Sequence, residues 1–549
     1  MLLKDCLGLQ CRYGYEDVAH MDAVLDGFND NELPVDAIWA DIDYLDDYKI
    51  WTNDPVKWPL ADFSTLIEKA HAQEKKVVTI VDSGIRAEPG YATFDRLQQK
   101  QVFIQDPTTP GAPYLGKVWP RVAAFTDWRH PQAQEFWTDE LQRFHDGLAI
   151  DGMWLDMDEI ESFCDGRCSI DFTVEDQLFG GDANSLYTCE CLTQNDNHLD
   201  DPPFLPGGGV PPGNCRTSKA AGLDCGTLSM AAKHYPYDSS TELEYNMHSL
   251  HGHMICKASY NALRDVRAQQ RPFILTRSAW VGTGHYAAHW LGDNSATWDD
   301  MKMATPAILT FSLFGIDMVG ADICGFSGDT TVELCTRWMQ VGAWYPFFRN
   351  HNAKGALDQE PFRMGNMVLE ASRHAINTRM SLTLYFYNLF HAASTQGGTV
   401  ARPLSFEFPD DTSTWDIDTQ FMVGPALMVS PALEKGATHV DVQFPVEDTL
   451  WYDYWTGMRM AIRVSPSAPL SVTLSVPATL GSPMPVHMRG GQIVARQDAG
   501  LSTAATVGGA IELVLAMPSA SSGNTGGTFA STRIVRDVST QAFSPQLGF

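Results

Sequence analysis

The stretch DGMWLDMDEIESF, residues 151–163, turns from small and apolar residues to acids within a few positions. DGMWL is followed by carboxylates at Asp156, Asp158, Glu159 and Glu161. A short continuous apolar run of this kind is typical of a strand buried on both faces. In an α/β barrel, the polar residue that ends such a strand faces the substrate site. The stretch therefore predicts a buried strand with a functional carboxylate at its end.

Similar runs recur along the first 410 or so residues, separated by amphipathic segments such as STLIEKAHAQEKK. They are LGLQCRYGY (7–15), AIWADIDYL (37–45), KVVTIVDSGI (76–85), DGMWLDMDE (151–159), PFILTRSAW (272–280), YAAHWLGDN (286–294), GIDMVGADICGF (315–326) and VARPLSFEF (400–408). Eight parallel-type strands with intervening helices predict an α/β fold, a (β/α)8 TIM barrel. A doubly wound open sheet is the alternative. A glycine-rich phosphate loop after the first strand would favour it, and the sequence has none there.

The predicted domains follow changes in amino-acid composition and in the pattern of apolar runs along the chain. Residues 1–411 are predicted to form the barrel, with a long insertion at about 161–240 that is rich in Cys, Pro, Gly and Asp. The insertion follows the fourth strand, which predicts a place over the C-terminal face as an ordered lid or a floppy excursion. Residues 412–498 read as short strands and turns, which predict a proximal C-terminal β-sandwich. Residues 499–549 are expected to be an incomplete distal β segment.

Charge and hydropathy narrow the classes of partner. The formal net charge of the 549-residue chain is -29 and its pI is about 4.8. A strongly acidic chain is not suited to nucleic acid or to an anionic membrane surface. No apolar run approaches the roughly 20 residues of a membrane span. Lys4 interrupts the apolar start, so no signal peptide is predicted in this chain.

The cysteine pattern allows two interpretations. The chain has 11 cysteines, several of them between Cys164 and Cys225. Disulfides in an oxidising compartment are one interpretation, and a zinc site is the other. Cys189 and Cys191 are separated by one residue, and no CxxC pair with partnering histidines is present, which counts against zinc.

Charged residues follow most of the predicted strands. They are Asp41 with Asp43, Asp82, Asp156, Arg277, Asp293, Asp322 and Glu407. A single Asp after a strand is usually a helix cap, but the repetition predicts a shared site. Two carboxylates that flank a sugar bond suffice for glycoside hydrolysis, and the best pair is Asp156 and Asp293. Tryptophans beside these acids suit the C–H faces of a sugar, or else fill the barrel interior; they are Trp39, Trp119, Trp154 and Trp290.

The motif WLDMDE, residues 154–159, resembles the W-[IL]-D-M-N-E signature of glycoside hydrolase family 31. Longer matches to the family are WADIDYLDDY, RPFILTRSAWVGTGHYAAHWLGDNSATWDD and LFGIDMVGADICGFSGDTTVELCTRWMQVGAWYPFFRNHN. The resemblance runs in order from about residue 7 to residue 495. Within the family the chain is most similar to the branch of acid α-glucosidase, maltase-glucoamylase and sucrase-isomaltase.

The resemblance implies a retaining, exo-acting α-glucosidase that releases terminal glucose from maltose, malto-oligosaccharides or starch- and glycogen-like glucans. Asp156 would be the nucleophile and Asp293 the general acid/base. Asp41, Arg277 and His351 would bind sugar hydroxyls. The pocket walls would be Trp119, Trp154, Met157, Trp290 and Phe326, with Asp322 and Asp82 in or just behind them. Cys324 and Cys335 would form a disulfide beside the site. The family uses no metal and no organic cofactor.

The chain departs from the family pattern at Asp158, where Asn is usual, and the extra charge is expected to shift the pH optimum. The N-terminal β-sandwich of the family is expected to be absent, since the first strand begins near residue 7. Two alternatives remain: another family 31 activity (α-xylosidase, transglucosidase or glucan lyase), and a truncated, inactive carbohydrate-binding form. The family and the cysteines favour the secretory route, meaning an extracellular, vacuolar or lysosomal location.

Overall fold

The computed structural model describes residues 8–163, 167–168, 199–200, 223–224, 226–446, 449–462 and 470–518. Most of the predicted insertion, with its cysteine cluster, lies outside these residues, as does the chain after residue 518. The chain forms two compact units. The first comprises Cys11–Leu25 and Ile38–Gly292, and the second comprises Leu2–Gln10, Asp26–Ala37 and the chain from Asp293 onward.

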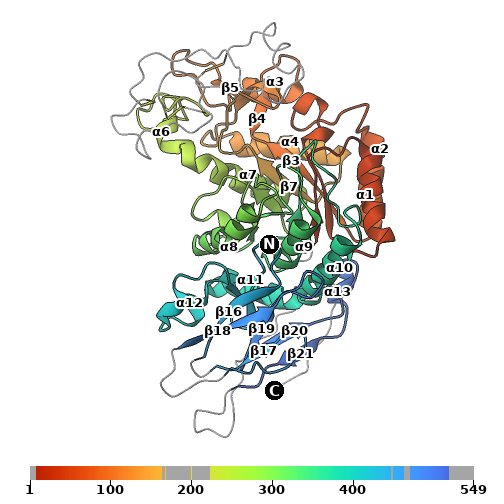
Figure 1. The fold of residues 1–549 in the computed structure, drawn as a ribbon. Coiled ribbons are helices and arrows are strands. Elements are labelled where there is room, and N and C mark those ends of the chain that lie inside the picture. Colours follow the sequence, from red (N-terminus) through yellow and green to blue (C-terminus); the bar gives the residue numbers. More distant parts are fainter. Residues whose placement is uncertain are drawn as a thin grey trace. The chain divides into compact units, whose positions relative to one another are not determined.

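The first unit is built on a parallel sheet with helices alongside it (Figure 1). Its strands run in the order β2-β3-β7-β8-β9. They are β2 (Ala37–Ala40), β3 (Lys76–Asp82), β7 (Gly152–Asp156), β8 (Ile274–Thr276) and β9 (Ala288–Trp290). Because neighbouring strands are parallel, their carboxyl ends meet at one edge of the sheet, and Asp82 pairs in register with Asp156.

Four helices of the first unit each bury one face, and α2 and α7 pack on this sheet. They are α2 (Leu60–Ala72), α3 (Ala92–Lys100), α4 (Ala133–Gly147) and α7 (His251–Val266). In α4 the spacing of Phe136, Trp137, Leu141 and Phe144 places all four on one buried side. Burying each such side chain contributes roughly 1.5–3 kcal/mol. The Trp137 indole also donates a 2.8 Å hydrogen bond to Ser259 Oγ of α7, which fixes how these two helices pack.

A small antiparallel sheet lies between β3 and α4 in the sequence. It has the order β4-β6-β5, with β4 (Gly84–Arg86), β5 (Leu115–Val118) and β6 (Arg121–Phe125). Its core includes Tyr114, Phe125 and Leu228, with Trp119 packed against it. The sheet therefore holds Trp119 beside Met157, which belongs to the same core.

The second unit contains a short parallel run, β1-β12-β11, formed by β1 (Leu9–Gln10), β12 (Arg349–Asn350) and β11 (Asp322–Ile323). β10 (Val319–Gly320) precedes β11. The helices are α8 (Trp298–Leu313), α9 (Val332–Gly342), α10 (Asn366–Ser381) and α11 (Thr383–Gln396). Arg349 pairs with Leu9 on one side and with Asp322 on the other.

The expected eighth barrel strand at 400–408 is wrong. The strand that follows β11 in the parallel run is β12, whereas residues 400–408 form β13 (Ala401–Arg402) and the short helix α12 (Leu404–Glu407). β13 pairs antiparallel with β14 in a different sheet. Pro403 interrupts the strand because it has no N–H to donate, and it stands at the start of α12. Glu407 lies on α12, where it accepts hydrogen bonds from Arg402 of β13 and Arg489 of β19, and it does not end a barrel strand.

The C-terminal part is all β. Its five-stranded sheet has the order β13-β14-β15-β19-β17, and two further pairs are β16-β18 and β20-β21. The strands are β14 (Phe421–Val423), β15 (Leu427–Val429), β16 (His439–Pro445), β17 (Trp451–Asp453), β18 (Ser471–Pro477), β19 (Val486–Arg489), β20 (Ile493–Arg496) and β21 (Glu512–Leu515). Met422, Met428, Phe444 and Trp451 lie in one buried cluster, as a sandwich prediction requires.

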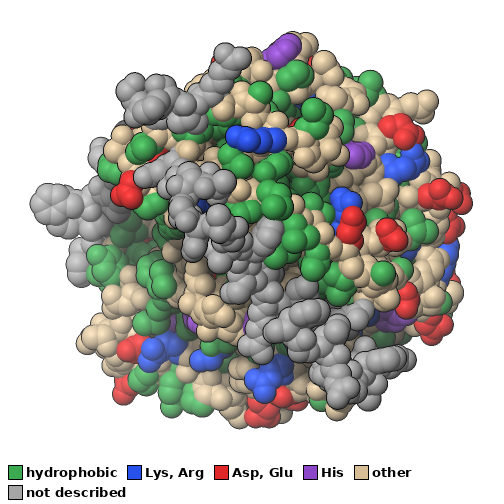
Figure 2. Space-filling model, turned by 90° about the horizontal axis from the view of Figure 1, so that it is seen from below, with side chains coloured by type: hydrophobic (Ala, Val, Ile, Leu, Met, Phe, Trp, Pro, Cys, Tyr) green, Lys and Arg blue, Asp and Glu red, His purple; other side chains and the backbone are tan. Residues whose placement is uncertain are grey.

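The surface carries hydrophobic side chains among the charged ones, as Figure 2 shows for one face. The more exposed ones in the second unit include Trp415 and Met303. Among the described residues, no helix combines the length and the apolar character needed to cross a lipid bilayer. The other elements of the described residues are α1 (Val18–Asp30), η2 (Ile42–Tyr44), η3 (Asp46–Tyr48), α6 (Glu244–Met247), η6 (His248–Leu250), η7 (Thr283–His285), η8 (Thr412–Thr414) and α13 (Thr503–Val507).

Candidate active site

Asp156 is the last residue of β7, where a parallel strand delivers its side chain to the carboxyl-end edge of the sheet. Its side chain is 14% exposed, so a substrate can reach it. Asp156 Oδ1 accepts a 2.8 Å hydrogen bond from the N–H of Met157. Met157 has φ 52°, a left-handed conformation that a non-glycine residue rarely adopts. Such strain occurs preferentially at functional sites, and here it turns the chain directly after the carboxylate.

Arg277 follows β8 and gathers the acids of the opening motif around one guanidinium. Its Nε lies 3.1 Å from Asp156 Oδ1 and 2.9 Å from Glu159 Oε1, and a terminal nitrogen lies 2.6 Å from Glu161 Oε2. Burial works to lower the pKa of Arg277, but the adjacent carboxylates of Asp156 and Glu159 raise it well above its usual value. Arg277 is therefore a permanent cation that holds Asp156 in place.

Asp82 ends β3, the strand next to β7, and Asp41 directly follows β2, which lies beyond β3. Asp82 is buried, and its carboxyl oxygens have no hydrogen-bond partner among the described residues. Burial, followed by the nearby carboxylates of Asp156 and Asp41, raises the pKa of Asp82 well above its usual value. Asp41 is also buried and accepts a 2.6 Å hydrogen bond from the N–H of Ile42. Asp41 thus caps η2, as well as lying at the strand end.

The tryptophans divide into two sets. Trp154 lies between Trp39 and Trp290, with ring centroids 6.0 and 5.5 Å away. All three are at most 2% exposed, so in this structure they mainly fill the interior of the first unit. Trp119 is partly exposed and contacts Tyr13, Tyr48 and Phe163. Trp119 is therefore the more accessible candidate for stacking on a sugar.

The second unit carries the other predicted residues. Asp293 is exposed and lies in the loop after β9, three residues beyond the end of that strand at Trp290. The next residue, Asn294, donates to the carbonyl of Asp322 at 2.9 Å and accepts from the N–H of Phe326 at 3.0 Å. Gly325 makes this approach possible, because a Cβ there would lie 2.3 Å from Ala296 Cα. These hydrogen bonds of Asn294 thus join the loop that contains Asp293 to the loop that contains Phe326.

Asp322 pairs with an arginine that the sequence analysis did not single out. Arg349 Nε and a terminal nitrogen lie 3.0 and 2.8 Å from Asp322 Oδ1, and both side chains are fully buried. The RNHN motif was the available signal, since Arg349 stands two residues before His351. His351 is buried and its ring lies 4.9 Å from that of Phe326. The Cys324–Cys335 disulfide, expected from the resemblance, is present between this loop and α9.

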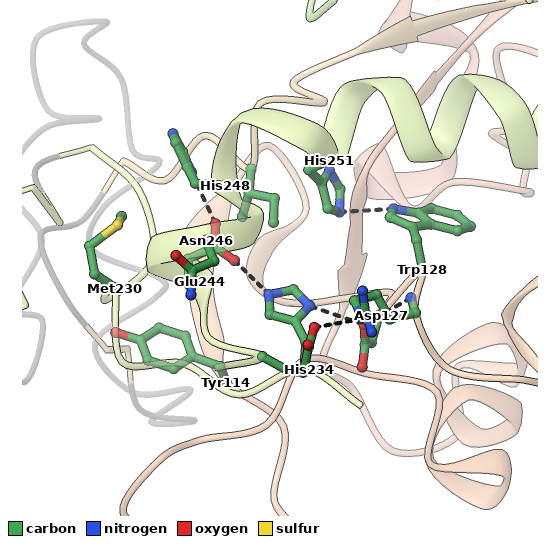
Figure 3. Close-up of polar contacts among 12 residues, drawn as sticks. Tyr114, Asp127, Trp128, Met230, His234, Glu244, Asn246, His248 and His251 are labelled. Carbon is green, nitrogen blue, oxygen red and sulfur yellow. Dashed lines mark hydrogen bonds and ion pairs between the residues drawn. The ribbon is translucent and has the colours of Figure 1, made fainter. Parts of the chain in front are cut away.

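A buried ion-pair cluster in the first unit was also not predicted (Figure 3). His234 Nδ1 lies 3.0 Å from Asp127 Oδ1, and its Nε2 lies 2.8 Å from Glu244 Oε2. His248 also contacts Glu244, at 3.0 Å. Burial alone would lower the pKa of His234, but the two carboxylates raise it to about 9. His234 is therefore a cation between two anions, which ties the end of the predicted insertion to α6 and to the turn that follows β6.

Among the described residues, neither unit alone brings together three side chains that could ligate an ion. The predicted site residues offer carboxylates, an arginine and a histidine for chemistry.

Comparison with known families decides the wider assignment. The family model described as "Glycosyl hydrolases family 31 TIM-barrel domain" matches residues 3–389. The chain belongs to glycoside hydrolase family 31. The C-terminal domain model of the same family matches residues 397–494. The predicted fold class, a (β/α)8 barrel followed by a β-sandwich, is thereby confirmed, whereas the predicted domain limits stay predictions.

Several curated family 31 proteins are similar to this chain over most of its length. An α-glucosidase of Aspergillus oryzae is 36% identical over 90% of this chain and 53% of its own. The lysosomal α-glucosidase of Rattus norvegicus is 36% identical over 90% and 48%. α-Xylosidase 1 of Arabidopsis thaliana is 35% identical over 93% and 53%. The chain thus spans about half the length of these relatives.

A solved structure supports the same family. The glucosidase II α subunit superposes with a TM-score of 0.78 at 26% identity, covering 94% of this chain and 49% of that one. The predicted resemblance to the α-glucosidase branch is confirmed by the curated relatives. The similar identity of the α-xylosidase means that overall sequence likeness does not select the sugar.

Proposed function

We propose that this chain is a retaining, exo-acting α-glucosidase that removes terminal α-linked glucose from maltose, malto-oligosaccharides or starch- and glycogen-like glucans. The observation that carries the proposal is Asp156 at the end of β7, held by Arg277 at 3.1 Å, in a chain 36% identical to α-glucosidases. A carboxylate held ionised by a guanidinium is a suitable nucleophile.

Asp156 attacks the anomeric carbon while Asp293 donates a proton to the glycosidic oxygen, and the leaving sugar departs. The resulting β-glucosyl ester on Asp156 is then attacked by a water that Asp293, now ionised, deprotonates. α-Glucose is released and both carboxyls return to their starting states. A retaining reaction of this type needs the two carboxyl groups roughly 5–5.5 Å apart.

The remaining predicted residues take supporting roles. Asp41, Arg277 and His351 bind hydroxyls of the reacting glucose. The pocket walls are Trp119, Trp154, Met157, Trp290 and Phe326, and Asp322 acts through its ion pair with Arg349. The substrate partner is an α-glucoside or α-glucan. We also place the protein on the secretory route, a proposal supported by the Cys324–Cys335 disulfide and by the lysosomal relative.

The second candidate is an α-xylosidase, which the Arabidopsis relative favours. The two sugars differ only in the hydroxymethyl group, so a matched pair of substrates separates them. The purified chain is given p-nitrophenyl α-glucoside and the corresponding α-xyloside, and nuclear magnetic resonance follows the first anomer released. Faster turnover of the glucoside with α-glucose formed first supports the proposal. Preference for the xyloside assigns the second candidate, and β-glucose formed first excludes a retaining reaction.

A further inference from the structure

Of the four acids between Asp156 and Glu161, Asp158 is the one for which no ion pair with Arg277 is seen among the described residues. Its side chain is fully buried, while Arg277 bonds Asp156, Glu159 and Glu161. Asp158 Oδ1 accepts a 2.9 Å hydrogen bond from the N–H of Ser278, and its Oδ2 lies 2.5 Å from Thr276 Oγ1. Asp158 therefore contacts both chain neighbours of Arg277, Thr276 before it and Ser278 after it.

The hydrogens of this contact can be counted. The Thr276 hydroxyl also lies 2.9 Å from the carbonyl oxygen of Ser278, which can only accept. An ionised Asp158 would likewise only accept, so the single hydroxyl hydrogen of Thr276 would face two acceptors. A protonated Asp158 donates from Oδ2 to Thr276 Oγ1, and Thr276 then donates to Ser278. Only the protonated form of Asp158 supplies one hydrogen to the Asp158–Thr276 contact and another to the Thr276–Ser278 contact.

We propose that Asp158 acts as a neutral carboxylic acid, a positioning residue that holds Thr276 and Ser278 so that Arg277 aims at Asp156. The positioning role in catalysis rests on the proposed function, whereas the protonation state of Asp158 does not. Ionisation would break the chain of hydrogen bonds and place a further negative charge beside Asp156 and Glu159. Asp158 thereby limits the pH range in which Arg277 keeps its position.

Burial and the neighbouring carboxylates favour the neutral form of Asp158. Burial, followed by the carboxylate of Glu159, raises the pKa of Asp158 well above its usual value, although the bonds from Thr276 and Ser278 act against this. His251 of α7 accepts from the Trp128 indole at Nε2, so its Nδ1–H donates to the Asp158 carbonyl, and burial lowers the pKa of His251 to about 4. The titratable or charged groups that face the Asp158–Thr276 contact are Asp82, Asp156, Glu159, His251, Cys256, Arg277 and His289.

Infrared spectroscopy tests the protonation state without any need for activity. An Asp158→Asn variant replaces the O–H donor with an N–H donor, so it is expected to fold with the same contacts. The parent-minus-variant spectrum at pH 5 should show the carbonyl stretch of one protonated carboxylic acid. Asp36 is a matched control. It is buried and accepts from the Thr503 N–H and hydroxyl at 2.6 and 2.7 Å, and among the described residues that hydroxyl has its further contact with a sulfur, Met380 Sδ at 3.9 Å, rather than with a second oxygen. The Asp36→Asn difference should lack the band. A carboxylate band for Asp158 at pH 5 would overturn the proposal.

The positioning role is tested by kinetics on α-glucosyl fluoride, whose leaving group needs no proton. At pH 5 the Asp158→Asn variant should keep kcat within about threefold of the parent, because its contacts are the same. As the pH rises, the parent should lose kcat over the range in which its infrared band disappears, and the variant should not. Identical pH profiles would overturn the positioning role. If neither protein turned over the fluoride, the proposed function would fail, while the infrared result would still decide the protonation state.

Discussion

At the scale of single residues, the site depends on one cation among several acids. Arg277 contacts three carboxylates through a planar guanidinium. An ammonium group is a point charge and cannot bridge them in the same geometry. We expect Arg277→Lys to lower kcat on maltose by about 10- to 1,000-fold, since a misplaced nucleophile loses its alignment.

Circular dichroism should show that the Arg277→Lys protein keeps its fold. Arg264→Lys on the surface of α7 is the matched control and should leave kcat unchanged. Parent-like kcat in the Arg277→Lys variant would show that Asp156 does not need the guanidinium.

Asp293 carries the proton in the proposed reaction, so its removal should affect substrates according to their leaving groups. Asp293→Ala is expected to lower turnover of maltose by about 10²–10⁴-fold. α-Glucosyl fluoride needs no proton, and added azide can attack the glucosyl ester without a base. Fluoride plus azide should therefore restore turnover and yield α-glucosyl azide, which mass spectrometry and nuclear magnetic resonance identify. An equal loss on both substrates, with no azide product, would remove Asp293 from the acid/base role.

The sequence predicts site residues that can be recognised from the few residues next to them. Asp156, Asp82 and Asp41 were predicted because each ends an apolar run, and the structure places all three at the ends of adjacent strands. Arg349 was missed, because a two-residue strand offers no apolar run to reveal it. The His234 cluster was missed because its members come from residues 127, 234 and 244, and no periodicity links them.

At the scale of elements, the same reasoning explains the wrong eighth strand. VARPLSFEF has a strand-like composition, but Pro403 removes a ladder donor and starts α12 instead. The strand that follows β11 in the parallel run, β12, has only two residues, and their charged and amide side chains are typical of a loop. Length and apolar content identify long buried strands such as β3 and β7, but not the shortest barrel strands.

The His234 cluster ties the end of the predicted insertion to α6 and to the turn after β6, and its contribution to the stability of the protein should depend on pH. The pKa of His234 is raised from its ordinary 6.5 to about 9 in the folded protein. Its contribution is therefore fully present below pH 6.5 and is lost as the pH rises to about 9. We expect His234→Gln to lower the free energy of unfolding by about 3 kcal/mol at pH 6, and by less at pH 9.5.

Urea denaturation of the two proteins at both pH values measures this difference. His439→Gln, an exposed histidine on β16, is the control and should change the stability little at either pH. A loss for His234→Gln that does not vary with pH would mean that the histidine acts by packing rather than by charge.

At the scale of the whole molecule, two compact units and two family domains do not coincide. The family models divide the chain between residues 389 and 397, whereas the contacts divide it at Gly292 and Asp293. Asp156 belongs to the first unit and Asp293 to the second. The order of motifs along the sequence predicted the barrel, but it could not give the distance between the two acids. That distance depends on side-chain placement across the whole barrel.

The measurement that tests the central claim most directly is glucose release from maltose by the purified 549-residue chain, beside its Asp156→Asn variant. The account predicts release by the parent and a loss of at least about 10⁴-fold in the variant, because an amide cannot form the glucosyl ester. Equal release by both proteins would contradict Asp156 as the nucleophile, and no release by the parent would contradict the proposed activity of this chain.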